Sequence, residues 1–129
     1  MSHTAVHQSL ITGVNAQFLE SAVQLAAEDC QGTVEHDAEA ANYVGGQREK
    51  CDIVIKTNTV KHGVGIRVGK GGNVSFVGDS YVRGWNEIKD LVTKHYSVLA
   101  IRAAAAEMGA SVASMTEVGR SVELNLEVA

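Results

Sequence analysis

Hydrophobic residues recur at helical spacing in two segments of the chain. In the first segment the apolar stripe consists of Leu19, Ala22, Val23, Ala26 and Cys30. This spacing predicts an amphipathic helix, with Asn15 placed to cap its start and Gly32 to close it in a left-handed conformation. The second stripe begins after Asn86 and consists of Ile88, Leu91, Val92, His95, Tyr96, Leu99, Ala103 and Ala106. It predicts a long helix that stops at Gly109.

Other segments alternate between apolar and polar residues, as half-buried strands do. In residues 51–57 this pattern places Cys51, Ile53 and Ile55 on one face and Asp52, Val54 and Lys56 on the other. Further strands are predicted at 2–11, 64–68 and 74–77, and at two segments around Gly119, of which 121–128 alternates most regularly. The glycine-rich stretch 69–73 indicates a hairpin connection. Residues 33–36 suit a strand and 39–47 suit a loop, so 33–50 stays unassigned.

This order of elements predicts a single α+β domain over residues 1–129. Strands grouped between two helices and joined by hairpins favour a mostly antiparallel sheet with both helices packed on one face, the arrangement of ferredoxin-like folds. The opposite face would carry the charged residues Asp52, Lys56, Arg67, Glu123 and Glu127. We therefore expect that face to be solvated or to meet a partner.

Composition agrees with one globular domain. The chain has 129 residues, of which 45% are hydrophobic, so it can bury a core without disulfides. No run of 18 apolar residues and no cationic leader are present, which favours a cytoplasmic protein with no membrane contact. In that compartment Cys30 and Cys51 would be reduced.

The net charge of -4 hides an uneven distribution. Residues 1–47 hold six acidic residues and no Lys or Arg, whereas 48–70 are basic. Four of the basic residues, Lys56, Lys61, Arg67 and Lys70, are candidates for contact with an anion or with nucleic-acid phosphates. No aromatic residues are interleaved with them for base stacking, so nucleic acid is the weaker interpretation. Contact with the acidic segment of a second copy, in a homo-oligomer, is the alternative.

Familiar catalytic and cofactor motifs are absent. The glycines between Gly63 and Gly72 match neither a phosphate-binding loop nor a dinucleotide fingerprint, and a hairpin explains them. Five histidines and two cysteines lack the spacing of a zinc site, and no nucleophile elbow occurs. We therefore predict no cofactor and no metal, and we favour a protein without catalysis.

The junction between the 74–77 strand and the long helix is the most promising functional surface. It combines Asp79, Tyr81, Arg83 and Trp85. These residues could form a pocket together with His3 and His7, which share one face of the first strand. The alternative is that Trp85 and Tyr81 close a core that has few aromatic residues.

Several short motifs resemble a known family. They are Met1-Ser2-His3, Asp52-Ile53-Val54-Ile55, Gly65-Ile66-Arg67, Ser75-Phe76-Val77-Gly78-Asp79 and the helix around Tyr96. Their order and spacing are similar to those of domain-of-unknown-function family 1257, which includes the hypothetical chloroplast reading frame 35 proteins of plastids and cyanobacteria. The chain departs from the family pattern at Thr4, Gly63 and Gly119. The resemblance implies a fold and no activity, and its matched positions are His3, Asp52, Arg67, Asp79 and Tyr96.

Three hypotheses about function follow from the sequence. The first is a small adaptor or assembly subunit that contacts a protein partner through its open sheet face or an edge strand. The second is a small-ligand-binding or enzymatic domain with a pocket near His3, Asp79 and Trp85. The third is nucleic-acid contact through the basic hairpin 56–70.

Overall fold

The computed structural model describes residues 4–8, 11, 13–42, 45–118 and 121–128. Its strands and helices, in chain order, are β1 (Ala5–Gln8), α1 (Ala16–Asp29), β2 (Thr33–Ala40), β3 (Glu49–Lys56), β4 (Val64–Val68), β5 (Val74–Gly78), α2 (Trp85–Glu107), β6 (Ala110–Val118) and β7 (Ser121–Val128). A short 3-10 turn, Lys70–Gly72, joins β4 to β5. No helix in the described part of the chain is both long and apolar enough to cross a membrane.

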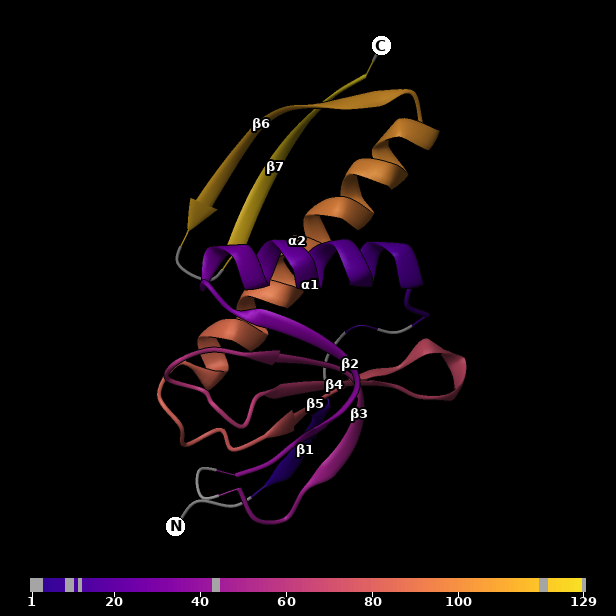
Figure 1. Ribbon diagram of the computed structural model, residues 1–129. Helices are drawn as coiled ribbons and strands as arrows, with labels where there is room; N and C mark the ends of the chain where they lie inside the picture. The colour runs from indigo at the N-terminus through magenta and orange to yellow at the C-terminus, as the bar shows by residue number, and fades with distance from the viewer. Residues whose placement is uncertain (1–3, 9–10, 12, 43–44, 119–120, 129) are drawn as a thin grey trace.

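The five strands β1 to β5 form one antiparallel sheet in the order β1-β5-β4-β3-β2 (Figure 1). Strands β2 to β5 follow one another as neighbours, and β1 pairs with β5 at the far edge. The predicted α+β class is confirmed. Strands β6 and β7 pair with each other in a separate two-stranded sheet, so the two C-terminal strands do not extend the main sheet.

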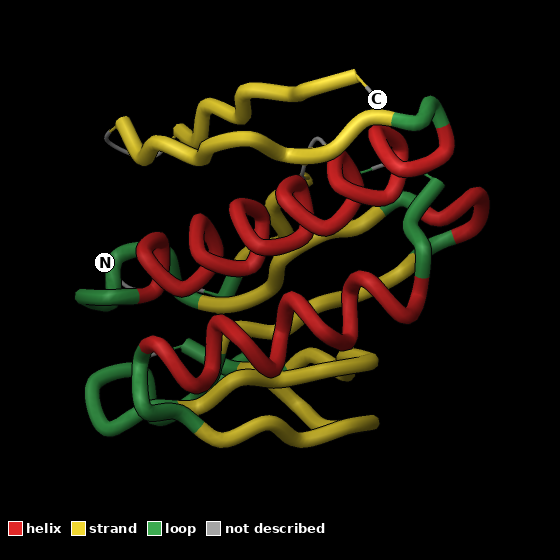
Figure 2. Tube along the Cα trace, turned by 90° about the horizontal axis from the view of Figure 1, so that it is seen from above, coloured by secondary structure: helices red, strands yellow, loops and turns green. Residues whose placement is uncertain are grey.

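Both helices cover the same face of the main sheet. Their apolar side chains form one core with Ile53, Ile66 and Phe76, which are directly paired across β3, β4 and β5. Viewed from above, α2 lies between α1 and the β6–β7 pair (Figure 2). The helix-covered face is therefore the main hydrophobic core, as the two apolar stripes predict.

Local sequence signals account for the start of α1. The Asn15 side chain accepts hydrogen bonds from the backbone N–H groups of Gln17 and Phe18, at 2.9 and 3.1 Å. The predicted N-cap is therefore confirmed. The predicted left-handed closure at Gly32 is wrong, because the residue with positive φ is Gln31, at 56°. Gly32 instead lies against the end of β3, where an added Cβ would stand 2.9 Å from the carbonyl oxygen of Lys56.

The stripe predicted for α2 is correct only in its first half. Ile88 and Val92 are buried, whereas near the C-terminus Ala105 is buried and Ala106 is exposed. This second half extends beyond the main sheet and contacts β6 and β7 (Figure 1). The side of the helix that is buried therefore changes along its length.

The opposite face of the sheet is covered by the chain itself. Residues 38–42 and 45–51 lie at the outer end of the β2–β3 hairpin, and we call them the hairpin end. Ala40 and Cys51 of the hairpin end pack against Val54 and Val77 of the sheet in a second, smaller core. Gly65 leaves room for this approach, since an added Cβ would stand 2.4 Å from the Cys51 sulfur. The middle of this face is therefore not solvated.

This arrangement corrects the predicted alternation in β3. Cys51 was expected to share a face with Ile53, yet it packs with Val54 on the other side of the sheet. The strand partner of this stretch, β2, contains Asp37 with a φ of 50°. Such a residue departs from extended geometry and bends a strand pair strongly, which rotates the side chains beyond it.

Candidate functional site

A cavity of about 250 Å³ opens at the end of the sheet where three connections meet. Its lining consists of Ala41, Asn42, Asn58, Thr59, Val60, Lys61, His62, Gly63, Asp79, Val82 and Trp85. We call it the Asp79 cavity. These residues come from the segment after β2, the loop between β3 and β4, and the connection from β5 to α2. Segments far apart in the sequence thus build one concave site.

The loop between β3 and β4 is held by its own polar groups. The Val60 N–H donates to the Thr57 hydroxyl oxygen at 3.0 Å, and the Thr57 N–H donates to the Val60 carbonyl at 3.2 Å. The loop ends at Gly63, whose φ is 88° and whose added Cβ would stand 2.3 Å from a Val54 methyl group. Glycine is therefore required where this wall of the cavity joins β4.

The connection from β5 to α2 is organised by Asp79. Its carboxylate accepts the N–H of Tyr81 at 3.1 Å, and its carbonyl accepts the N–H of Val82 at 3.0 Å. The turn leads into Trp85, which is fully buried and lies against Gly78. An added Cβ at Gly78 would stand 2.2 Å from the indole nitrogen, so the tryptophan depends on that glycine for its place in the cavity wall.

The third wall comes from the segment after β2. The N–H of Ala41 donates to the carbonyl of His62 at 3.0 Å, which joins this segment to the β3–β4 loop. Asn42 uses its side-chain oxygen to accept the N–H of Gly46 at 2.8 Å. The ring of His62 lies against Gly45, where an added Cβ would be 3.1 Å away. The loops are therefore tied directly to each other.

The polarity of the cavity changes with depth. Asp79 is 1% exposed and Asn42 is 7% exposed, and these are the buried polar residues among those described. His62 is half-buried, and Lys61 is exposed. Val60, Val82 and Trp85 add apolar surface. The site thus combines a deep carboxylate and amide with a cation near the solvent, which suits a small polar molecule.

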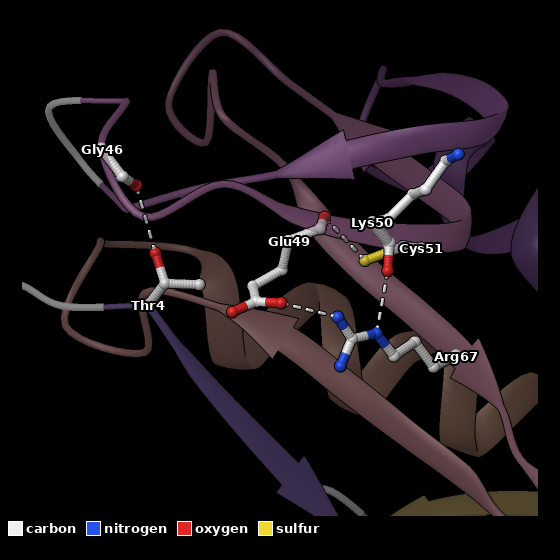
Figure 3. Close-up of polar contacts among 6 residues, drawn as sticks. All are labelled: Thr4, Gly46, Glu49, Lys50, Cys51 and Arg67. Atoms are coloured by element: carbon white, nitrogen blue, oxygen red, sulfur yellow. Dashed lines mark hydrogen bonds and ion pairs between the residues drawn. The ribbon is translucent and has the colours of Figure 1, made fainter.

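A second, more open hollow of about 390 Å³ lies beside the hairpin end. Its residues include Asp37, Lys50, Cys51, Asp52, Arg67 and Ser75. Figure 3 shows Arg67 extending from β4 toward the hairpin end, where its Nε donates to the Lys50 carbonyl and its Nη2 to the Glu49 carboxylate, both at 2.8 Å. The Asp52 carboxylate accepts the N–H of Val68 at 2.8 Å. Side chains thus replace the backbone pairing that β3 and β4 lack here.

Hydrogen bonds of Thr4 and Cys51 also lie in this region. Thr4, just before β1, contacts the hairpin end. Its hydroxyl donates to the Gly46 carbonyl at 3.4 Å (Figure 3). Its N–H donates to the Gln47 side chain at 3.2 Å. The Cys51 thiol donates to the Glu49 carbonyl at 3.4 Å, and burial raises the pKa of this thiol. A buried thiol with a raised pKa is a poor nucleophile, so the second hollow has no activated cysteine.

The residues predicted for one functional surface do not all meet. Asp79 and Trp85 line the Asp79 cavity, whereas Tyr81 is 71% exposed and Arg83 is exposed, and neither lines it. The expectation that Tyr81 and Trp85 pack together over the core is therefore wrong for Tyr81. The predicted His3 lies outside the described residues. His7 lies in β1 opposite Phe76 of β5.

The remaining predicted positions have structural contacts. The Tyr96 hydroxyl accepts the N–H of Asn15 at 3.0 Å, and its ring meets Phe18 edge to face with centroids 6.4 Å apart. Tyr96 therefore fastens α2 to the start of α1. Asp52 and Arg67, also matched in the family resemblance, join β3 to β4 as described above.

The four basic candidates do not form one patch. Lys56 pairs with Glu35 of β2 at 2.8 Å, and Arg67 pairs with Glu49. Lys61 precedes β4 and Lys70 follows it, so these two lie at opposite ends of that strand. The acidic β2 is the neighbour of β3, which carries Lys56, so part of the charge separation seen in the sequence is paired within the chain.

Sequence reasoning missed several cavity residues, namely Asn42, Asn58, Thr59 and His62. The polar run Asn58, Thr59, Lys61, His62 between two apolar strands was the available signal, because such loops carry binding residues. Asn42 belongs to the segment that the sequence left unassigned. Within the described part of the chain, no three His, Cys, Asp or Glu side chains gather closely enough to hold a metal ion.

Comparison with known proteins adds no relative. No family model matches the chain, and no curated protein or solved structure matches it. The resemblance to domain-of-unknown-function family 1257 is therefore neither supported nor contradicted.

Proposed function

We propose that this protein binds a small polar molecule in the Asp79 cavity. The observation that carries the proposal is the position of the buried polar residues: Asn42 and Asp79 are the two in the described part of the chain, and both line this cavity. Each of these side chains accepts a backbone N–H, Asn42 from Gly46 and Asp79 from Tyr81, so the polar groups of the cavity wall are held in fixed positions. Fixed polar groups at one opening favour a polar ligand. Apolar walls with a few polar groups are typical of small-molecule sites.

Construction of the walls also supports the proposal. Because Gly63 and Gly78 have no side chain, Val54 packs closely against the first and Trp85 against the second. Hydrogen bonds also join the loops around the opening. A site whose walls are held before the ligand arrives loses less conformational entropy on binding. The cavity is too small for a macromolecular segment other than a single side chain and is suited to a metabolite.

Thermal unfolding in the presence of a metabolite library tests this proposal. A ligand at 100 times its dissociation constant stabilises the folded state by about 2.7 kcal/mol, which raises the melting temperature by several degrees. Thr59→Trp, which places a large side chain at the exposed edge of the cavity, should abolish the shift. Thr116→Trp, at an exposed position in β6, should leave it unchanged. A shift that survives Thr59→Trp would place the ligand elsewhere.

The predicted protein partner is a second candidate, favoured by a different region. Exposed apolar side chains gather in the C-terminal part of the chain: Ile101 of α2 is 42% exposed, Met108 68% and Met115 of β6 47%. Such residues suit protein contact. The free edge of β2 is less suitable for strand addition, because it carries charged residues and the positive-φ Asp37.

Light scattering after size-exclusion chromatography tests the partner hypothesis for self-association. A dimer that becomes a monomer on Met108→Lys would support it, and a strict monomer at all concentrations would remove the homo-oligomer. Tyr81→Lys, at an exposed residue outside this C-terminal group, is the control and should leave the oligomeric state unchanged.

A further inference from the structure

We infer that the ligand of the Asp79 cavity is a short oxo acid, with a carbonyl oxygen directed inward and a carboxylate directed toward the solvent. The inference rests on the proposed function. It starts from two residues with hydrogen-bond donors that line the same cavity at different depths. Asn42 is 7% exposed, whereas Lys61 is exposed.

The orientation of the Asn42 amide is fixed by its neighbour. Its side-chain oxygen accepts the N–H of Gly46 at 2.8 Å, so the other end of the amide is the Nδ2 amino group, which can only donate. Among the described residues, none accepts a hydrogen bond from this amino group. A buried donor without an acceptor costs free energy, and a ligand oxygen in the cavity would remove that cost.

The acceptor at this depth is a neutral oxygen. A charged oxygen would lose its water there and would share the cavity with the Asp79 carboxylate, which is 1% exposed and accepts the N–H of Tyr81. Repulsion between two anions is strongest where water is excluded. A carbonyl oxygen accepts a hydrogen bond from the Asn42 amino group without adding a charge, so it fits the deep end.

The outer end of the cavity selects an anion. Lys61 provides an ammonium group near the solvent, and the half-buried His62 follows it in the loop. A ligand carboxylate can reach this ammonium group without losing all its water. An exposed ion pair contributes little to affinity, so Lys61 orients the ligand more than it holds it.

Apolar side chains complete the lining of the cavity. Val60, Val82 and Trp85 lie in it together with the polar residues. A short hydrocarbon segment between the carbonyl and the carboxylate would contact these side chains. The ligand class is therefore an oxo acid of a few carbon atoms, and neither a simple carboxylate nor a simple ketone combines all three features.

Isothermal titration calorimetry with matched probes tests the inference. The oxo acids are pyruvate, 4-oxopentanoate and 5-oxohexanoate, which differ in the distance between carbonyl and carboxylate. Each is compared with the carboxylate that lacks the oxo oxygen (propanoate, pentanoate, hexanoate) and with the ketone that lacks the carboxylate (propanone, 2-pentanone, 2-hexanone). We expect at least one oxo acid to bind about tenfold more tightly than its carboxylate and about threefold more tightly than its ketone.

Asn42→Asp tests the deep donor. It keeps an oxygen for the Gly46 N–H and replaces the amino group by a second acceptor. The oxo acid should therefore lose its advantage over the matched carboxylate. Asn73→Asp makes the same change at an exposed residue outside the cavity, and it should leave that advantage at about tenfold.

Lys61→Gln tests the outer cation. It should weaken the same oxo acid about threefold and leave the matched ketone unaffected, because the lysine is exposed. Lys70→Gln, at an exposed lysine outside the cavity, is the matched control and should change neither. The Lys61 comparison keeps the test valid if Asn42→Asp fails to fold.

Each remaining outcome contradicts the inference. Carboxylates that bind as tightly as their oxo acids would mean that the Asn42 donor does not select the ligand, and ketones that do so would remove the role of Lys61. Failure of all the probes, while a library compound binds and loses its binding in Thr59→Trp, would overturn the oxo acid and leave the proposed function intact. Failure of the probes and of the whole library would overturn both.

Discussion

The two faces of the main sheet are covered in different ways. The face toward α1 and α2 presents the large side chains Ile53, Ile66 and Phe76. The opposite face presents Val54, Gly65 and Val77, and the hairpin end covers it with Ala40 and Cys51. The first cover is apolar packing between helices and sheet. On the second face, small residues pack closely against each other. Hydrogen bonds from Arg67 and Thr4 to the hairpin end hold it in place at the edge of this contact.

This difference shows that a sheet face can be buried without large apolar side chains. A glycine at the centre lets two backbones approach, and the contact area is then made by small side chains. A small core contributes less hydrophobic stabilisation, so it depends more on well-placed hydrogen bonds. Three substitutions measure the two faces against each other.

The largest effect is expected on the helix-covered face. Phe76→Ala removes a fully buried ring and should lower the free energy of unfolding by about 3–5 kcal/mol, because the cavity left behind cannot collapse completely. Urea denaturation measures it. Val68→Ala, at a side chain that is 39% exposed, should change stability by less than about 0.5 kcal/mol. Equal effects of the two variants would contradict the assignment of the main core.

An intermediate effect is expected at the glycine beneath the hairpin end. Gly65→Ala adds a Cβ 2.4 Å from the Cys51 sulfur and 3.0 Å from the Cβ of Ala40, so it should destabilise by about 1–3 kcal/mol through overpacking. Gly69→Ala is the matched control, since its nearest neighbour is 3.7 Å away and its φ is −88°. If Gly65→Ala is as stable as Gly69→Ala, the hairpin end does not pack on this face.

The smallest change in stability is expected from Arg67→Gln. Removing a partly exposed ion pair and one hydrogen bond to the Lys50 carbonyl should cost about 1 kcal/mol. The same change should raise the reaction rate of Cys51 with a thiol reagent severalfold, measured in a Cys30→Ser background. Lys56→Gln, which breaks the Lys56–Glu35 pair, should leave that rate unchanged. An unchanged rate in Arg67→Gln would mean that Arg67 does not hold the hairpin end.

The pH dependence of the same reaction gives an independent measure. Burial raises the pKa of the Cys51 thiol, so its thiolate fraction at neutral pH is below that of an ordinary cysteine. The rate should therefore rise at higher pH than for a free thiol. By linkage, the stability tied to this group is fully present below the unfolded pKa and is lost as the pH rises through the folded pKa. The Arg67 charge lowers the pKa of this thiol, so its loss alone would move the rate profile to still higher pH. A shift of the Arg67→Gln profile toward that of an exposed thiol would therefore report opening of the hairpin end.

Sequence patterns predicted most of the individual elements because the relevant signals are local. The Asn15 cap, the alternation in β4 and the glycines of the β4–β5 turn each involve a few neighbouring residues. The pattern failed at Cys51, where the bend near Asp37 reverses the face that a side chain meets. It also did not show that β6 and β7 form their own sheet, since alternation does not identify the partner of a strand.

The candidate site was predicted in part. Asp79 and Trp85 stood out as polar and aromatic residues at a junction between strand and helix, and both line the cavity. Tyr81 belongs to the same turn but is exposed, because the turn directs neighbouring side chains to different sides. His62 and Asn42 were missed because their proximity depends on the Ala41–His62 hydrogen bond between separate segments.

By itself, the sequence determined the α+β class, the two helices and most strands, since periodicity and capping act over a few residues. Only the tertiary structure decided that Lys56 pairs with Glu35 within the chain, that the hairpin end covers the second sheet face, and that Asp79 shares a cavity with Lys61. The physical reason is range. These features require residues from different elements to approach, and that approach depends on how the strands bend and on where glycine leaves space.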